Sequence, residues 1–187
     1  AGAEIVMLNA LTDPGLPNLD GLYIGGGFPE THAKILAENE GFRDDVRRLA
    51  DEGLPIYAEC GGLMYLGESL VLDGVAYPMA GVFPVIFGFS RRPEGHGYTI
   101  FEIQRPNPYF KEGDRIRGHE FHYSELINGS LEIANLYQVI NREGVELGPD
   151  GFVVYNTLAG YIHFHFGSNL EMAGNFVESC KEYQEKS

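Results

Sequence analysis

Basic residues are scarce in this chain. Its 187 residues include 13 Lys and Arg against 27 Asp and Glu, so the formal net charge is −14. A surface that binds nucleic acid needs a basic footprint, and an anionic membrane surface repels a strongly acidic protein. We therefore expect no nucleic acid and no membrane among the partners of this protein.

Long apolar runs and cysteines are also few. No apolar run approaches the roughly 18 residues of a transmembrane helix, and residues 1–10 have neither the basic start nor the cleavage pattern of a signal peptide. Two cysteines are too few for a disulfide framework, so we expect a cytoplasmic protein. Hydrophobic residues nevertheless make up 44% of the chain, which is enough for the core of a single domain over residues 1–187.

The first 70 residues alternate between short apolar runs and helical patterns. Residues 5–8, 22–24 and 55–58 are apolar runs bounded by turn signals, and their length predicts strands. Residues 30–51 and 61–70 carry apolar side chains at helical spacing, and Asn39 is placed to split the longer segment into two helices. Strands that alternate with helices predict a parallel sheet covered on both faces.

The second half is richer in strand patterns. We predict strands over residues 82–89, 98–103, 121–123, 152–155 and 161–166, several of them separated by turn pairs. An amphipathic pattern over residues 169–183 predicts a final helix. The sequence therefore predicts a mixed α/β sandwich with extra strands in its second half.

The segment PIYAECGGLMYL places Cys60 between a predicted strand and a predicted helix. This is the arrangement of a nucleophile elbow, in which a tight turn presents the nucleophile at the edge of the sheet. The neighbours Gly61 and Gly62 permit such a turn, and a helix start favours the thiolate. We interpret Cys60 as a nucleophile rather than a buried structural cysteine. Cys180, in the final predicted helix, is interpreted as passive.

The glycine run of residues 25–27 follows another predicted strand. It is not a P-loop, because no Lys-Ser or Lys-Thr follows, and it lacks the Rossmann spacing. This loop and Cys60 both follow predicted parallel strands, whose carboxyl ends share one edge of a sheet. We expect the N–H groups of Gly27 and Gly61 to form an oxyanion hole beside Cys60. A simple tight turn is the alternative for the loop.

Histidines gather in the second half of the chain. His163 and His165 share one face of the predicted strand at residues 161–166, and His119 and His122 lie in another strand pattern. Histidine is the usual activator of a cysteine nucleophile. The alternatives are hydrogen-bonded histidines on a polar strand face, or metal ligands in a small β-barrel dioxygenase or isomerase. The metal alternative leaves Cys60 and the glycine loop unused, so we predict no metal site.

Four segments together resemble a known family: PIYAECGGLMYLG, LYIGGGFPE, RGHEFHYSEL and YIHFHF. They are similar to the class I, CobB/CobQ-like glutamine amidotransferase domain of cobyrinic acid a,c-diamide synthases. The resemblance implies a flavodoxin-like α/β sandwich with a mostly parallel central sheet. It also implies a glutaminase that supplies ammonia for ATP-dependent amidation of tetrapyrrole carboxylates in cobalamin biosynthesis. The nickel-sirohydrochlorin a,c-diamide synthase of methanogens is similar too, and these segments do not separate the two.

The resemblance implies a role for each matching position. Cys60 would attack the side-chain amide of glutamine and form a glutamyl thioester, with Gly27 and Gly61 holding the oxyanion. A histidine of the YIHFHF segment would transfer the proton: His163 by alignment with sister amidotransferases, with His165 as the other choice. Residues of the HEFHYS segment would line the glutamine pocket, namely Glu120, His122, Tyr123 and Ser124.

Two departures from the family pattern affect these expectations. Many class I amidotransferases carry His-Pro-Glu, in which the Glu orients the His, and His165 occupies that Glu position here. The catalytic group is then a dyad unless Glu59 or Glu120 stands in. Family members also carry an upstream synthetase domain with a P-loop, which this sequence lacks.

The lack of a synthetase domain leads to expectations about cofactors and about the start of the amidotransferase domain. We expect no cofactor in this chain, with ATP and Mg²⁺ bound by the synthetase domain of the same polypeptide. The amidotransferase domain is expected to begin one strand-helix unit earlier than residue 1. A sheet without that strand would have an exposed edge, which favours a homodimer or poor solubility.

Two other classes of function remain open on the sequence. A cysteine hydrolase on a related fold, such as a glutamyl-cleaving peptidase, would use the same nucleophile without an ammonia-using partner. A silent regulatory or subunit-contact domain would keep the fold without the chemistry. The presence of Cys60, Gly61 and His163 argues against the silent domain, and the reactivity of Cys60 discriminates between them.

Overall fold

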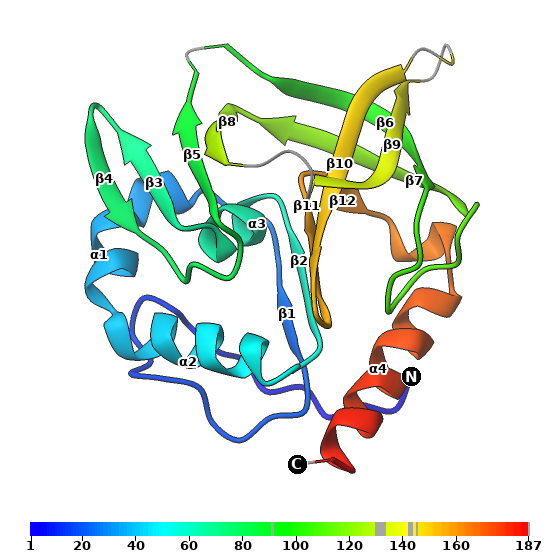
Figure 1. The fold of residues 1–187 in the computed structure, drawn as a ribbon, viewed down its shortest axis with the longest axis horizontal. Helices are drawn as coiled ribbons and strands as arrows, with labels where there is room; N and C mark the ends of the chain where they lie inside the picture. Colours follow the sequence, from blue (N-terminus) through cyan, green and yellow to red (C-terminus); the bar gives the residue numbers. More distant parts are fainter. Residues whose placement is uncertain (91, 130–133, 142–143, 145, 187) are drawn as a thin grey trace.

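The strands of the protein form two sheets in the computed structural model, which describes residues 1–90, 92–129, 134–141, 144 and 146–186 (Figure 1). Within this described part, the larger sheet has eight strands in the order β1-β2-β11-β10-β9-β6-β7-β12. The smaller sheet has four, in the order β4-β3-β5-β8. The larger sheet places β2 beside β11, so early and late segments of the chain lie side by side.

Parallel pairing lies at one end of the larger sheet. The strands there are β1 (Leu22–Ile24), β2 (Ile56–Glu59) and β11 (Thr157–Gly160). All four residues of β2 are buried, as expected of a strand covered on both faces. Because β1 and β2 are parallel, the glycine loop and Cys60 follow them at the same edge of the sheet.

The rest of the larger sheet is antiparallel. Its strands are β10 (Glu146–Val154), β9 (Ala134–Asn141), β6 (Gly95–Ile103), β7 (Arg115–His122) and β12 (His163–Phe164). The sheet curls, so that β7 returns to the parallel end: the carbonyl oxygen of Phe121 lies 3.9 Å from Sγ of Cys60. The predicted α/β sandwich with extra strands in its second half is confirmed.

The smaller sheet is joined to the larger one where the chain passes from one into the other. It consists of β3 (Ser69–Leu72), β4 (Val75–Pro78), β5 (Val85–Phe89) and β8 (Ser124–Gly129). The chain passes from β7 into β8 at Tyr123, within the HEFHYS segment. This segment therefore lies at the junction of the two sheets.

The described helices are α1 (Ala33–Glu38), α2 (Glu40–Asp51), α3 (Gly61–Leu66) and α4 (Glu171–Gln184). The predicted split at Asn39 is confirmed, and its side-chain amide donates to the carbonyl oxygens of Ala10 (2.8 Å) and Asp13 (2.9 Å). None of these helices has the length and apolar character that a bilayer crossing requires.

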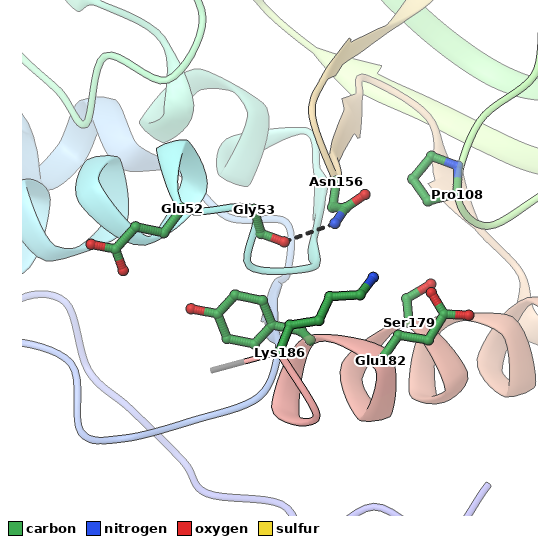
Figure 2. A pocket seen from close by; sticks show the side chains of 8 residues that line it. Glu52, Gly53, Pro108, Asn156, Ser179, Glu182 and Lys186 are labelled. Carbon is green, nitrogen blue, oxygen red and sulfur yellow. Dashed lines mark hydrogen bonds between the residues drawn. The ribbon is translucent and has the colours of Figure 1, made fainter.

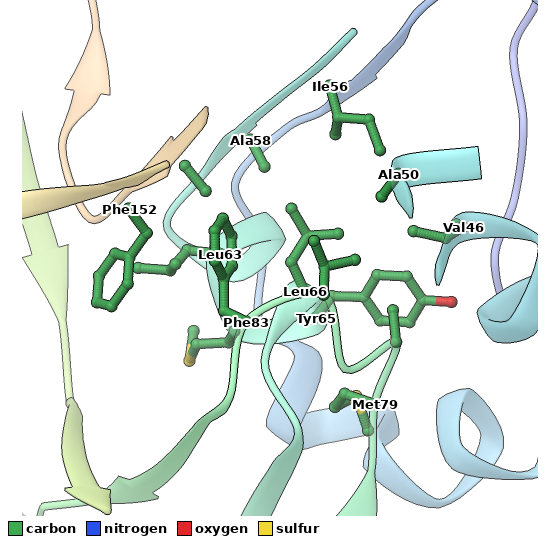
Figure 3. Packing of buried hydrophobic residues seen from close by; sticks show 14 of the residues in the cluster. Val46, Ala50, Ile56, Ala58, Leu63, Tyr65, Leu66, Met79, Phe83 and Phe152 are labelled. Atoms are coloured by element: carbon green, nitrogen blue, oxygen red, sulfur yellow. The ribbon is translucent and has the colours of Figure 1, made fainter. Parts of the chain in front are cut away.

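Two hydrophobic clusters pack on opposite faces of β2. Ile56 and Ala58 belong to the first cluster with residues of α2 and α3, whereas Tyr57 belongs to the second, which includes Met172 of α4. Figure 3 shows the first cluster gathered around α3, with Leu66 near its centre. Packing on both faces holds the strand and helix on either side of Cys60 in place.

Three expected elements differ in the structure. The helix expected over residues 61–70 ends at Leu66, and residues 69–70 begin β3 instead. Residues 5–8 are not a strand, and Ile5 and Met7 are 82% and 86% exposed. A short apolar run becomes a strand only where a neighbour supplies hydrogen bonds and a face to pack on, and no described strand pairs with this run. The strand expected over residues 161–166 is reduced to β12, because it pairs with β7 only at His119 and Gly118.

Candidate active site

Cys60 occupies a strained turn between β2 and α3. Its φ of +48° and ψ of −101° lie where residues with a Cβ are rarely found. The turn is held by hydrogen bonds from the Cys60 N–H to the carbonyl of Gly160 (2.7 Å) and from the Met64 N–H to the carbonyl of Cys60 (3.1 Å). This is the geometry expected of a nucleophile elbow. The thiol is 3.9 Å from the carbonyl oxygen of Phe121, and the residue is 4% exposed.

The glycine loop after β1 packs on both the elbow and His163. A Cβ on Gly61 would lie 2.6 Å from the carbonyl oxygen of Gly27 and 2.8 Å from its nitrogen, so this contact requires glycine. A Cβ on Gly26 would overlap the ring of His163. The N–H of Gly61 belongs to the first turn of α3, where N–H groups have no intrahelical acceptor. The structure thus brings Gly27 and Gly61 together beside Cys60, and their role as oxyanion donors stays a prediction.

His163 lies beside Cys60. Its side chain interacts with that of Cys60, and its Nδ1 atom is 3.6 Å from Oε2 of Glu59. The interaction with Cys60, followed by that with Glu59, raises the pKa of His163 to about 9 although burial opposes the shift. The ring also stacks on that of His119, with centroids 4.7 Å apart. A histidine in this setting holds a proton at neutral pH and can deliver it to a leaving group.

His165 lies outside this arrangement. β12 ends at Phe164, and His165 is an exposed residue that precedes the 3₁₀ turn Phe166–Ser168. The N–H and hydroxyl of Ser168 both donate to the carbonyl of His165, at 2.7 Å each, which closes this turn. The structure therefore brings His163 to Cys60 and leaves His165 on the surface, while the catalytic role of either histidine stays a prediction.

Glu59, directly before Cys60, is a buried carboxylate that is 4% exposed. Its Oε1 accepts the O–H of Tyr57 (3.3 Å) and the N–H of Phe164 (3.1 Å), and its Oε2 accepts the O–H of Tyr23 (3.3 Å). Burial, followed by the charge of Glu59, raises the pKa of Tyr23 to about 12 and that of Tyr57 well above its usual range. Both phenols are therefore protonated donors at neutral pH.

Glu120 and His119 lie next to each other on β7. Glu120 is half-buried, and burial followed by the charge of Asp150 raises its pKa to about 7. Burial and the neighbouring His163 lower the pKa of His119. A lowered pKa leaves the His119 ring neutral where it stacks on His163, which avoids repulsion between two charged rings.

His122 and Ser124 of the HEFHYS segment contact Tyr161. The His122 ring stacks on that of Tyr161 with centroids 3.9 Å apart, its Nδ1 lies 2.9 Å from the carbonyl oxygen of Ser124, and burial lowers its pKa. Ser124 is buried and its hydroxyl donates to that of Tyr161 (3.3 Å), whereas Tyr123 is 39% exposed. The segment reaches Cys60 through the carbonyl of Phe121, and its role in binding glutamine stays a prediction.

The histidine patterns do not converge on a ligand set for a metal. In the part of the chain that the structure describes, no group of three or more His, Cys, Asp or Glu residues is placed to hold a metal ion. Cys180 also differs from Cys60: it lies in α4, and burial followed by the charge of Asp20 raises its pKa to about 11. Cys180 is therefore a protonated thiol at neutral pH and serves as an internal comparison for Cys60.

A hollow of about 600 Å³ lies at the other end of the parallel strands. Gly53 and Asn156, which precede β2 and β11, contribute to its wall, and the Asn156 amide donates to the carbonyl of Gly53 (2.8 Å; Figure 2). Ser179, Glu182 and Lys186 of the C-terminal segment face it from the opposite side. Because Cys60 follows the carboxyl end of β2, this hollow is separate from the candidate site.

Solved structures share this fold. A protein described as a glutamine amidotransferase superimposes with a TM-score of 0.60 over 87% of this chain and 79% of its own, at 19% identity. The structure of PurLQS from Thermotoga maritima gives a TM-score of 0.53 over 87% of this chain and 79% of its own, at 14% identity. The fold of the chain is therefore that of the glutamine amidotransferases.

Sequence comparison defines the family more closely. The model of the CobB/CobQ-like glutamine amidotransferase domain matches residues 1–170, and the chain belongs to this family. The cobyrinate a,c-diamide synthase of Archaeoglobus fulgidus is 42% identical over 95% of this chain and 39% of its own length. That of Caldanaerobacter subterraneus is 39% identical over 99% of this chain and 41% of its own length. The chain thus spans about two fifths of the length of these relatives.

The surroundings of the site include residues that sequence reasoning did not assign. Tyr23 and Tyr57 reach Glu59, and His119 stacks on His163. The two tyrosines are aligned partners in β1 and β2, and Tyr57 and Glu59 share a face as residues i and i+2 of one strand. The i, i+2 spacing could have indicated from the sequence that Tyr57 lies near Glu59. The contacts of Tyr23 and His119 depend on strand pairing, which the sequence does not show.

Proposed function

We propose that this chain is the glutaminase part of an amidotransferase and hydrolyses glutamine through Cys60. The observation that carries the proposal is the contact between the strained Cys60 turn and the His163 side chain at one edge of the sheet. Membership of the glutamine amidotransferase family supports glutamine as the substrate. The reducing cytoplasm is the compartment that suits a free thiol at this position.

The first half of the reaction forms a thioester. The Cys60 thiolate attacks the side-chain amide carbon of glutamine, and the carbonyl oxygen becomes an oxyanion that the N–H groups of Gly27 and Gly61 bind. His163 then gives its proton to the amide nitrogen, the C–N bond breaks, and ammonia leaves. The pKa of about 9 means that this proton is already on His163 at neutral pH.

The second half releases glutamate. Neutral His163 takes a proton from water while the water oxygen attacks the thioester carbon. The C–S bond breaks, which returns Cys60 to the thiolate and His163 to its protonated state, and the carboxylic acid product ionises. The residues of the HEFHYS segment would hold the glutamine during both steps, namely Glu120, His122, Tyr123 and Ser124.

We further propose that the ammonia amidates a tetrapyrrole, with cobyrinate as the first candidate. The relatives named cobyrinate a,c-diamide synthase support this substrate. The carboxylate to be amidated must first be activated, and we assign that step, with ATP and Mg²⁺, to a synthetase domain of the same polypeptide. The net charge of −14 also favours placing a polyanionic tetrapyrrole on that domain rather than on this one.

The nucleophile and its substrate can be tested together by mass spectrometry. The natural protein is incubated with a chloroketone analogue of glutamine, with and without excess glutamine, and then digested. We expect one adduct, on Cys60, which glutamine suppresses and Cys60→Ser abolishes, while Cys180→Ser leaves it intact. Equal or stronger labelling of Cys180, or labelling that glutamine does not suppress, would contradict the proposal.

The use of the ammonia needs a separate assay. The natural protein is supplied with glutamine, ATP, Mg²⁺ and either cobyrinate or nickel-sirohydrochlorin, and amidated products are identified by mass. We expect ATP-dependent amidation of cobyrinate. Amidation of nickel-sirohydrochlorin alone would correct the substrate, and glutamine hydrolysis without amidation of either would indicate a hydrolase instead.

A further inference from the structure

Four groups from three strands converge on the Glu59 carboxylate. The Tyr57 O–H and the Phe164 N–H donate to Oε1, the Tyr23 O–H donates to Oε2, and Nδ1 of His163 faces Oε2 at 3.6 Å. Both oxygens are thus fixed by hydrogen bonds before His163 is counted. The carboxylate cannot rotate without breaking at least one of them.

Because Glu59 is buried, its carboxylate needs partners that replace water. A carboxylate removed from water is costly unless hydrogen bonds and an opposite charge compensate. The two phenols and the backbone N–H supply hydrogen bonds but no charge, whereas the protonated His163 ring supplies the charge. Glu59 is therefore paired with the protonated side chain that interacts with Cys60.

The ring of His163 is held in one orientation as a consequence. Its Nδ1 atom faces Glu59, its ring stacks on His119, and the ring edge abuts Gly26. A histidine that moves protons at one nitrogen needs the other nitrogen bound to an acceptor, which sets the tautomer and stabilises the charged ring. Two other carboxyl groups of the described structure, those of Glu120 and Asp150, do not meet this condition, since neither is among the groups that act on His163.

We propose that Glu59 is the positioning residue of the glutaminase site, holding the Nδ1–H of His163 so that Nε2 serves Cys60 and stabilising the charged ring. This inference rests on the proposed function of Cys60 and His163. It completes the catalytic group as Cys60, His163 and Glu59, with the carboxylate contributed by the residue before the nucleophile. A purely structural role, tying β1, β2 and β12 together, is the alternative.

The test separates the two roles by titrating His163. Glu59→Gln keeps the shape and the Oε1 acceptor but removes the charge. In the natural protein, we expect the pKa of His163 to fall from about 9 toward its ordinary value, measured by NMR on the ring resonance that His163→Ala removes. The other titratable groups that interact with His163 are Cys60, His119 and His122, and they are unchanged in this variant.

The same variant is examined for reactivity. We expect labelling of Cys60 by the chloroketone analogue to slow by about 100-fold in Glu59→Gln, the size of effect usual for a disrupted acid–base group. Glu59→Asp keeps the charge and should recover part of both the rate and the pKa. Asp150→Asn is the control for loss of a buried carboxylate, and it should leave the pKa of His163 unchanged, because Asp150 is not among the groups that act on that ring.

A structural role predicts a different outcome. If Glu59→Gln lowers only the melting temperature, and the pKa of His163 and the labelling rate match the wild type, the inference is wrong. If Glu59→Gln does not fold, Tyr23→Phe decides: it removes the donor that competes for Oε2, so the pKa of His163 should rise, and no change would overturn the inference. The NMR titration needs no glutamine, so it stands even if Cys60 proves unreactive and the proposed function fails.

Discussion

At the scale of single residues, the proposed reaction needs both Cys60 and His163. We predict that His163→Ala slows thioester formation by about 10²–10⁴-fold, because the proton for departing ammonia is lost. His165→Ala should retain most of the wild-type rate, since His165 is an exposed residue beyond the end of β12. Single-turnover formation of the glutamyl thioester, followed by mass spectrometry, measures both. Loss of the thioester only in His165→Ala would show that the assignment of His163 is wrong.

The residues of the site were predictable to different degrees. Cys60 stands out because its signal is local: a short apolar strand, a cysteine and two glycines in succession. The choice of the proton-transferring histidine could be narrowed to His163 or His165. The sequence could not decide between them, because strand alternation places both on the same face. Glu59 could be named only as a stand-in, because its contacts come from β1 and β12, which are distant in sequence.

The loop–elbow contact is the feature to test at the scale of elements. A Cβ on Gly61 would lie 2.6 Å from the Gly27 carbonyl oxygen, so Gly61→Ala must push the glycine loop away from α3. We expect labelling of Cys60 to slow at least about 10-fold, because displaced oxyanion donors lose much of their effect. A labelling rate equal to that of the wild type would contradict the predicted oxyanion role of this contact.

Gly174→Ala is the matched control for this experiment. Gly174 lies in α4, and a methyl group added to its Cα would meet no other atom within 4 Å, so the substitution leaves the packing unchanged. Alanine should stabilise the helix by about 0.5–1 kcal/mol relative to glycine and leave labelling of Cys60 unaffected. Urea unfolding of both variants shows whether the effect of Gly61→Ala is local or follows from lost stability.

Elements with local signals were predicted well. The junction at Asn39 was predicted from a residue type that is unfavourable inside a helix, and in the structure its side chain binds the carbonyls of Ala10 and Asp13, outside both helices. The run at residues 5–8 has the composition of a strand but no described strand pairs with it. Strand formation depends on a partner, which a local pattern does not reveal.

At the scale of the whole molecule, we expect the half-buried carboxyl group of Glu120 to make the stability depend on pH. The folded pKa of Glu120 is raised from 4.5 to about 7, so its favourable contribution is complete below pH 4.5 and is lost as the pH rises through 7. We predict that the free energy of unfolding of the wild type falls between pH 4.5 and pH 8 relative to that of Glu120→Gln. Urea unfolding of both proteins across this pH range measures the difference in their free energies of unfolding. Groups that titrate alike in both proteins do not contribute to this difference.

A second variant controls for the loss of one negative charge from an acidic protein. Glu125→Gln removes an exposed charge on β8, and its stability should follow that of the wild type in parallel across the same pH range. If Glu120→Gln behaves like Glu125→Gln, the half-buried carboxyl of Glu120 is not the source of the pH dependence. A parallel decline in all three proteins would instead reflect general repulsion at a net charge of −14.

The sequence by itself determined the α/β class, the strand–Cys60–helix turn and the glycine loop beside it. These depend on local composition: strand-length apolar runs, a cysteine flanked by glycines and a glycine run after a strand. Only the tertiary structure decided which histidine meets Cys60, which carboxylate meets that histidine, and how the later strands curl back to the parallel ones. Those contacts join β1, β2, β7 and β12, and pairing between distant strands is set by the packing of the whole sheet rather than by any single segment.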